Sequence, residues 1–147
     1  MFKHILIPTD GSAIAAKAIK AGVALAKEMG ASVTAYYAIE PLPARLYSEG
    51  RIIDRNLIND LDQKARETAE NSVRQVSDAA REAGVTCDTV IDRLVSPYRG
   101  IIDAAAEKKC DAVVMASHGY SGLQELLLGS VTHKVLTHSK IPVLVYR

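Results

Sequence analysis

The chain has 147 residues and a formal net charge of +1, from 18 basic and 17 acidic side chains. This length suits one domain over residues 1–147, which can bury a core without disulfides or a structural metal. The near-neutral charge argues against a nucleic-acid binder, because such proteins need clustered Lys and Arg to neutralise phosphates. No apolar run approaches the roughly 20 residues of a membrane span. We therefore expect neither nucleic acid nor a membrane among the partners.

The start of the chain and its two cysteines indicate the cytoplasm. Residues 1–8 lead directly into an apolar run, without the layout of a signal peptide. Cys87 and Cys110 lie far apart and form no C-x-x-C pair. We expect two reduced, partly buried thiols in a reducing compartment.

Short apolar runs alternate along the chain with segments of helical periodicity. Ser12 and Ser130 can cap helix starts, Pro97 suits a first helical turn, and Gly30 and Gly84 suit helix ends. The expected strands are 5–8, 31–39, 85–91, 111–116 and 142–146, and the expected helices are 13–29, 57–83, 97–109 and 130–138.

The longest of these helices, 57–83, has an apolar stripe from Leu57 through Val73 to Ala83, which we predict to face the core. The segment before it contains Pro41, Pro43 and Gly50 and is the least regular part of the chain. We expect the greatest mobility there.

This alternation predicts an α/β fold, a doubly wound parallel sheet with right-handed crossovers and helices on both faces. Such sheets bind ligands beyond the carboxyl ends of their strands. Polar, glycine-bearing loops follow two strands, at residues 9–12 and 117–130. If the first and fourth strands are neighbours, these loops face each other across a crevice.

The later loop has the equipment to hold a phosphate. Gly119, Gly122 and Gly129 let the backbone approach a ligand or adopt positive φ. A helix starting near Ser130 offers free N–H groups and the positive end of its dipole, and Ser121 could add a hydroxyl. The same residues could instead only shape a turn and start a helix, and composition leaves both readings open.

Asp10 ends the first strand and has two interpretations. It can stabilise the turn beside Ser12, or its carboxylate can accept hydrogen bonds from a ribose hydroxyl or a base amine. The chain has neither a P-loop pattern nor a G-x-G-x-x-G after the first strand. The later loop contains no lysine. Phosphate charge would therefore be met by amides, hydroxyls and a metal ion.

Four segments resemble the universal stress protein family, and the likeness covers nearly the whole chain. They are residues 5–12, 113–119, 127–132 and 141–145. The resemblance implies a five-stranded parallel sheet of order 3-2-1-4-5 and a homodimer joined through the last strand.

The resemblance extends to the family's ATP-binding branch, whose pattern is G-x2-G-x9-G-[ST]. Gly119, Gly129 and Ser130 match this pattern, and Ala116 stands where the first glycine is expected. A methyl group there would weaken binding if the position needs positive φ or contacts the ribose.

The resemblance also implies a site. Asp10 would meet the adenosine, the Ala38 backbone would recognise the adenine, and the Val131 N–H would bind phosphate beside Ser130. The full implied set is Pro8, Thr9, Asp10, Ala38, Met115, Ala116, His118, Gly119, Gly129, Ser130 and Val131. The implied cofactor is ATP with Mg²⁺, with no metal ligands assigned to the protein.

Three functions follow, in decreasing order of support. The first is a nucleotide-binding sensor or regulator of the stress response. The second is a nucleotide-free dimeric interaction module, which Ala116 favours. The third is an enzyme, with slow ATP hydrolysis at most, because no general base or arginine finger is evident. A triad of Ser117, His118 and Asp10 is not expected, since adjacent Ser and His cannot easily reach each other in the geometry that a triad requires, and no G-x-S-x-G elbow exists.

Overall fold

The computed structural model describes residues 1–43, 54–119 and 127–147. Gly50, Ser121 and Gly122, which the sequence analysis singled out, lie outside the described residues.

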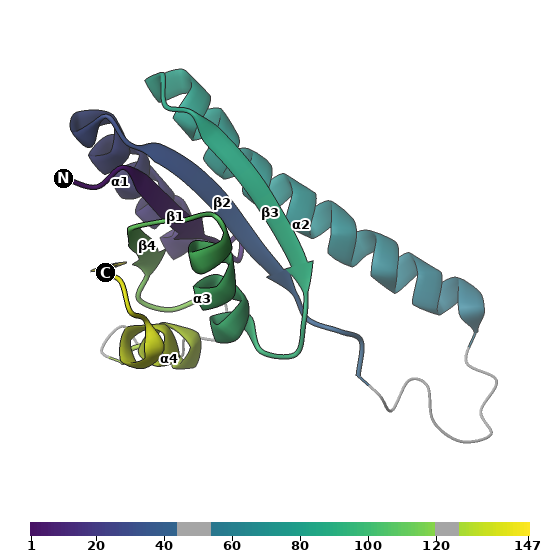
Figure 1. The fold of residues 1–147 in the computed structure, drawn as a ribbon. Helices are drawn as coiled ribbons and strands as arrows, with labels where there is room; N and C mark the ends of the chain where they lie inside the picture. Colours follow the sequence, from purple (N-terminus) through teal and green to yellow (C-terminus); the bar gives the residue numbers. More distant parts are fainter. Residues whose placement is uncertain (44–53, 120–126) are drawn as a thin grey trace.

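A parallel sheet of five strands runs through the centre of the molecule (Figure 1). The strand order is β3-β2-β1-β4-β5, which confirms the predicted order 3-2-1-4-5. The strands are β1 His4–Pro8, β2 Ser32–Ile39, β3 Cys87–Arg93, β4 Ala112–Ala116 and β5 Val143–Tyr146. Every neighbouring pair is parallel, so the carboxyl ends of β1 and β4 meet at one edge of the sheet.

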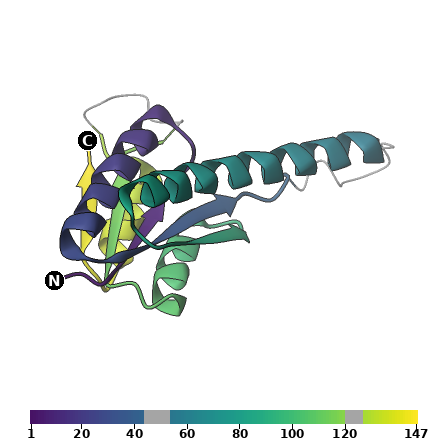
Figure 2. The same ribbon diagram turned by 90° about the horizontal axis from the view of Figure 1, so that it is seen from above.

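Helices cover both faces of the sheet, as expected for a doubly wound fold (Figure 2). The helices are α1 Ala13–Met29, α2 Arg55–Ala83, α3 Pro97–Glu107 and α4 Ser130–His138. One core cluster joins α1 and α2 to the sheet, and the other joins α3 and α4 to its opposite face. The predicted α/β class is therefore confirmed.

The helix ends follow the sequence signals, with one exception. The Ser12 hydroxyl accepts a hydrogen bond from the Ala15 N–H at 3.3 Å, and Gly30 and Gly84 end their helices in the left-handed conformation. The predicted cap at Ser130 is wrong, because Gly129 is the N-cap residue and Ser130 is already helical. The Ser130 hydroxyl therefore does not cap α4.

The prediction for β3, residues 85–91, is wrong by two residues at each end. Val85 directly follows Gly84, the C-cap residue of α2, and its N–H donates to the Ala80 carbonyl of that helix at 2.8 Å. At the other end the strand continues to Arg93, which pairs with Ile39. β3 is an edge strand, and edge strands tolerate charged side chains such as those of Asp92 and Arg93.

The apolar stripe of α2 is buried over only part of its length, which corrects the prediction that all of it faces the core. Ala69, Val73, Val76 and Ala80 are buried, whereas Leu57 is 52% exposed. The first half of α2 extends beyond the end of the sheet (Figure 2). Periodicity identified the helix but could not show where its packing partner ends.

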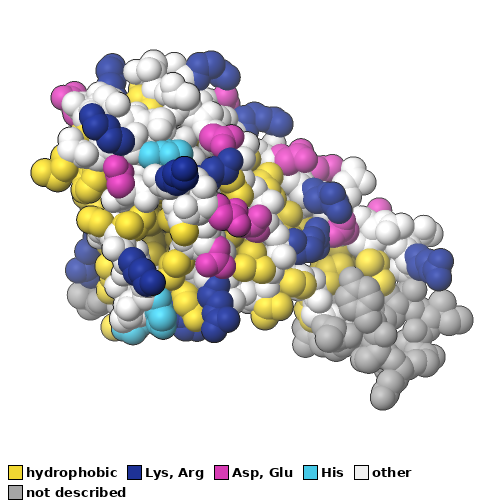
Figure 3. All heavy atoms as spheres, in the orientation of Figure 1, with side chains coloured by type: hydrophobic (Ala, Val, Ile, Leu, Met, Phe, Trp, Pro, Cys, Tyr) yellow, Lys and Arg dark blue, Asp and Glu magenta, His cyan; other side chains and the backbone are white. Residues whose placement is uncertain are grey.

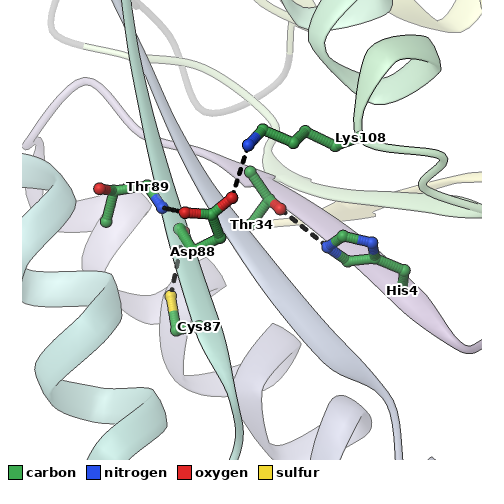
Figure 4. A network of polar contacts seen from close by, with 6 residues as sticks. All are labelled: His4, Thr34, Cys87, Asp88, Thr89 and Lys108. Carbon is green, nitrogen blue, oxygen red and sulfur yellow. Dashed lines mark hydrogen bonds and ion pairs between the residues drawn. The ribbon is translucent and has the colours of Figure 1, made fainter.

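Polar contacts tie the strands together at the amino-terminal end of the sheet (Figure 4). His4 and Thr34 are joined by a hydrogen bond of 2.8 Å, and the Lys108 ammonium pairs with Asp88 at 2.6 Å. The hydrogen bond from Lys108 lowers the pKa of the Asp88 carboxyl. This network lies at the edge opposite the polar loops, so it supports the sheet away from the candidate site.

The surface gives no sign of a basic stripe on the face that carries α3. Figure 3 shows Lys and Arg side chains interspersed with Asp and Glu on this face. Within the described ranges, no helix is both long enough and apolar enough to cross a membrane.

Candidate functional site

A cavity of about 470 Å³ opens where the carboxyl ends of β1, β2 and β4 meet the first turns of α3 and α4. Small-molecule sites typically measure about 300–1,000 Å³. Its described lining is Pro8, Thr9, Asp10, Ala15, Tyr36, Tyr37, Ala38, Glu40, Pro97, Ile101, Met115, Ala116, His118, Gly119, Gly129, Ser130, Val131 and Thr132. Every residue of the predicted site lies in this one lining.

The two polar loops meet at Asp10 and Gly119. The Asp10 Oδ1 accepts a hydrogen bond from the Ser12 N–H at 2.9 Å, which orients the carboxylate at the start of α1. A Cβ atom on Gly119 would overlap the other carboxylate oxygen. A side chain at position 119 would therefore displace the Asp10 carboxylate, and the position does not need glycine for positive φ, which Gly119 does not adopt.

The later loop is closed tightly at its base. The Gly129 N–H donates to the Ser117 carbonyl at 2.7 Å, and the Ser117 N–H donates to the Tyr146 carbonyl, also at 2.7 Å. A Cβ on Gly129 would lie 3.1 Å from the His118 Cα, closer than ordinary contact. This closure places the first residue of α4 in the cavity wall.

The N-terminus of α4 offers donors to the cavity. The N-cap residue Gly129 has no side chain, and the first N–H bonded within the helix is that of His133, to the Gly129 carbonyl at 2.9 Å. The N–H groups of residues 130–132 thus lack intrahelical partners. The Thr132 hydroxyl donates to the Ala116 carbonyl at 2.9 Å and anchors α4 to β4. Such a helix end can bind an anion.

Ala116 ends β4 in a conformation that alanine accepts. Among the described residues, Lys109 is the one non-glycine residue with positive φ. The backbone therefore does not need glycine at this position of the family pattern. Any effect of the methyl group must come from contact with a ligand.

Several lining residues were missed from the sequence: Glu40, Tyr36, Pro97 and Ile101. Glu40 follows β2, and strand order places the end of β2 beside β1. Tyr36 is opposite Pro8 in the register of these strands. Burial raises the pKa of the Tyr36 hydroxyl, and the Asp92 carboxylate raises it further. These positions could have been predicted from the strand order that the resemblance implied, because that order places β2 beside β1.

Ser117 and His118 contact each other through Nδ1 of the imidazole, whereas a catalytic triad pairs its serine with Nε2, so this contact is not the geometry of a triad. The Ser117 Oγ lies 2.9 Å from the His118 Nδ1. Ser117 is only 3% exposed, however, and does not line the cavity. Its hydroxyl is therefore poorly placed to attack a bound substrate, and the contact serves to orient the imidazole.

Across residues 1–43, 54–119 and 127–147, no group of three or more His, Cys, Asp or Glu side chains is placed to hold a metal ion.

The model of the universal stress protein family matches residues 1–147. The chain belongs to this family. Among curated universal stress proteins, MJ0531 of Methanocaldococcus jannaschii is 36% identical, and the match covers 100% of this chain and 83% of the relative.

Solved structures of universal stress proteins share the fold. The structure of MJ0577, also from Methanocaldococcus jannaschii, has a TM-score of 0.80 and 31% identity, over 99% of this chain and 95% of that chain. A universal stress protein in complex with cAMP has a TM-score of 0.70 and 25% identity, over 99% of this chain and 97% of that chain.

Proposed function

We propose that this universal stress protein binds an adenine nucleotide, ATP with Mg²⁺, and acts as a stress-response sensor or regulator in the cytoplasm. The observation that carries the proposal is the meeting of Asp10, Gly119 and the N-terminus of α4 in one cavity. The Asp10 carboxylate, which can accept hydrogen bonds from ribose hydroxyls, therefore lines the same cavity as the α4 amides, which can bind a phosphate.

The residues of the cavity fit the parts of the nucleotide. Asp10 would accept hydrogen bonds from the ribose, the Ala38 backbone would meet the adenine, and Ser130 and Val131 would hold phosphate oxygens. When bound, Mg²⁺ would neutralise phosphate charge. The structure of a relative in complex with cAMP supports an adenine nucleotide as the ligand class.

Loss of the Ser130 hydroxyl is expected to weaken binding of Mg²⁺–ATP about tenfold, the effect of one hydrogen bond to a charged group. Calorimetric titration of wild type and Ser130→Ala measures this. Thr137→Ala, which removes an exposed hydroxyl near the other end of α4, is the control and should bind like wild type. Wild type that binds no adenine nucleotide at millimolar concentration would reject the proposal and favour the nucleotide-free interaction module.

A homodimer through β5 is the second part of the proposal. Among the described strands, β5 lies at the edge of the sheet and has β4 as its one neighbour, and Leu144 on it is 45% exposed. The opposite edge strand, β3, bears Asp88, Asp92 and Arg93, which discourage further pairing. Strand β5 has no charged residue between Val143 and Tyr146. A second copy can extend the sheet at this edge by two-fold symmetric pairing.

Replacing Val145 with proline is expected to convert the dimer into a folded monomer. The carbonyls of Pro142 and Tyr146 accept hydrogen bonds from the N–H groups of Val113 and Ser117 on the β4 side, so the N–H of Val145 points to the free edge. Proline removes that donor and is tolerated on edge strands. Light scattering after size-exclusion chromatography measures the mass, and Val145→Thr, which keeps the N–H, should remain dimeric. A dimeric Val145→Pro would place the interface elsewhere.

A further inference from the structure

Two cations and a histidine gather around one tyrosine where α3 meets α4. The Lys134 Nζ lies 5.5 Å from the centre of the Tyr98 ring, and the central carbon of the Arg99 guanidinium lies 5.9 Å from it. The His138 ring packs against the same tyrosine, with 5.1 Å between the ring centroids. Figure 3 shows His side chains next to Lys and Arg side chains over α3 and α4. We call these four residues the cationic cluster.

The Tyr98 ring holds the cations of the cluster in place. Tyr98 is half-buried and packs against the core under α3 and α4, so its position is fixed. Lys134 and Arg99 lie over this ring, where cation–π attraction holds them, and the Arg99 Nε also donates to the Tyr98 hydroxyl at 3.1 Å. Cations that are already ordered lose less conformational freedom when a partner binds.

The histidine adds a polar group whose tautomer is set by the helix. The His138 Nδ1 lies 2.8 Å from the Lys134 carbonyl. A carbonyl can only accept a hydrogen bond, so Nδ1 carries the proton. Nε2 is therefore the ring nitrogen that a partner can reach, and it becomes a third donor when the imidazole is protonated.

The sequence that contains α4 carries charge of one sign. Residues 126–147 include Lys134, Lys140 and Arg147 and no Asp or Glu. The other 15 of the 18 basic residues and all 17 acidic residues lie in residues 1–125, so the formal charge is +3 for the last part and −2 for the rest. A negatively charged partner is attracted to the part of the surface that this segment forms.

The cations of the cluster are open to a carboxylate from another molecule. Arg99 and Lys134 are exposed, and in the part of the chain that the structure describes neither forms an ion pair, although Asp103 lies one turn from Arg99 on α3. Nucleic acid is bound by many cations along a series of phosphates, whereas this cluster has two fixed positive charges. Its half-buried Tyr98 ring adds an apolar surface between them, and an acidic peptide carries groups of both kinds.

We propose that the cationic cluster is a docking surface for an acidic segment of a partner protein. Asp or Glu side chains of that segment would pair with Arg99 and Lys134, and an apolar side chain would lie on Tyr98. The four residues are not part of the described cavity lining, so the assignment does not depend on nucleotide binding. Pro97 and Val131, in the same two helices, do line the cavity, so the surface adjoins the site of the proposed regulator.

Fluorescence anisotropy with the labelled peptide EELEELEE tests the proposal, at a salt concentration of about 20 mM so that surface charges are little screened. Wild type should bind with a dissociation constant below about 1 mM, and the double variant Arg99→Gln/Lys134→Gln at least about fivefold more weakly. Lys20→Gln/Arg74→Gln loses the same charge from exposed positions on α1 and α2, across the sheet, and should bind like wild type. No binding by wild type at millimolar peptide, or equal losses in both double variants, would overturn the proposal.

Two further probes test the class of partner under the same conditions, without nucleotide. They are vesicles that contain phosphatidylserine and a short DNA duplex. Each should bind more weakly than the peptide, because neither matches a pair of cations beside an aromatic ring. If either bound more tightly than the peptide and Arg99→Gln/Lys134→Gln abolished that binding, the partner would be a membrane or a nucleic acid, and the assignment to an acidic protein segment would be wrong.

Discussion

Gly119→Val is expected to weaken binding of Mg²⁺–ATP at least about 100-fold, the cost of losing two or more hydrogen bonds to charged groups. Even a Cβ atom at this position overlaps the Asp10 carboxylate, which is also held by the Ser12 N–H. The carboxylate must therefore move from its place in the cavity, and the valine methyl groups occupy space meant for the ligand. Calorimetric titration measures the affinity.

The fold of Gly119→Val should persist, because residue 119 lies in a loop and outside both core clusters. Circular dichroism and thermal unfolding check this. Ala24→Val, at an exposed position of α1, is the control for an added apolar side chain and should bind normally. If Gly119→Val bound Mg²⁺–ATP within about threefold of the wild-type affinity, Asp10 and Gly119 would have no role in nucleotide binding.

Gly100→Ala is expected to destabilise the protein by about 2 kcal/mol, within the range of overpacked cores. At an exposed helix position the same change stabilises, because alanine is the better helix former. Here a Cβ atom would overlap the Tyr36 hydroxyl and lie 3.1 Å from both δ carbons of Leu94. Tyr36 is 1% exposed and packed in the core under α3, so its ring cannot yield freely.

Tyr36→Phe should rescue most of the loss caused by Gly100→Ala. The Tyr36 hydroxyl is buried without a hydrogen-bond partner in the described part of the chain, so its removal by itself should change stability little. Urea denaturation of the four proteins of this double-mutant cycle measures the coupling. Destabilisations that simply add would show that the hydroxyl is not what excludes a side chain at position 100.

The parts of the fold that depend on local signals could be predicted from the sequence. Ser12, Gly30 and Gly84 mark helix ends by their own chemistry, and they do so in the structure. Asp10 and Gly119 could be paired in advance because parallel strands bring their carboxyl ends to one edge, once β1 and β4 are neighbours. That neighbourhood was implied by the resemblance and not by periodicity.

The incorrect predictions concern features that depend on how far a neighbouring strand or helix extends, which the local sequence does not show. Leu57 has the spacing of a core residue, yet the sheet ends before it reaches that turn of α2. Asp92 and Arg93 have the polarity of a loop, yet an edge strand accommodates them. Glu40 and Pro97 enter the cavity wall through the arrangement of β2 and α3, which no short motif encodes.

The most direct test of the account is a titration of isotope-labelled protein with Mg²⁺–ATP, followed by backbone amide NMR. The predicted result is saturable shifts concentrated at Asp10, Ala38, Gly119 and Ser130, with the outer edge of β3 unaffected. Shifts centred on another surface, or no saturable shifts at millimolar nucleotide, would contradict the claim that these two loops form one nucleotide site.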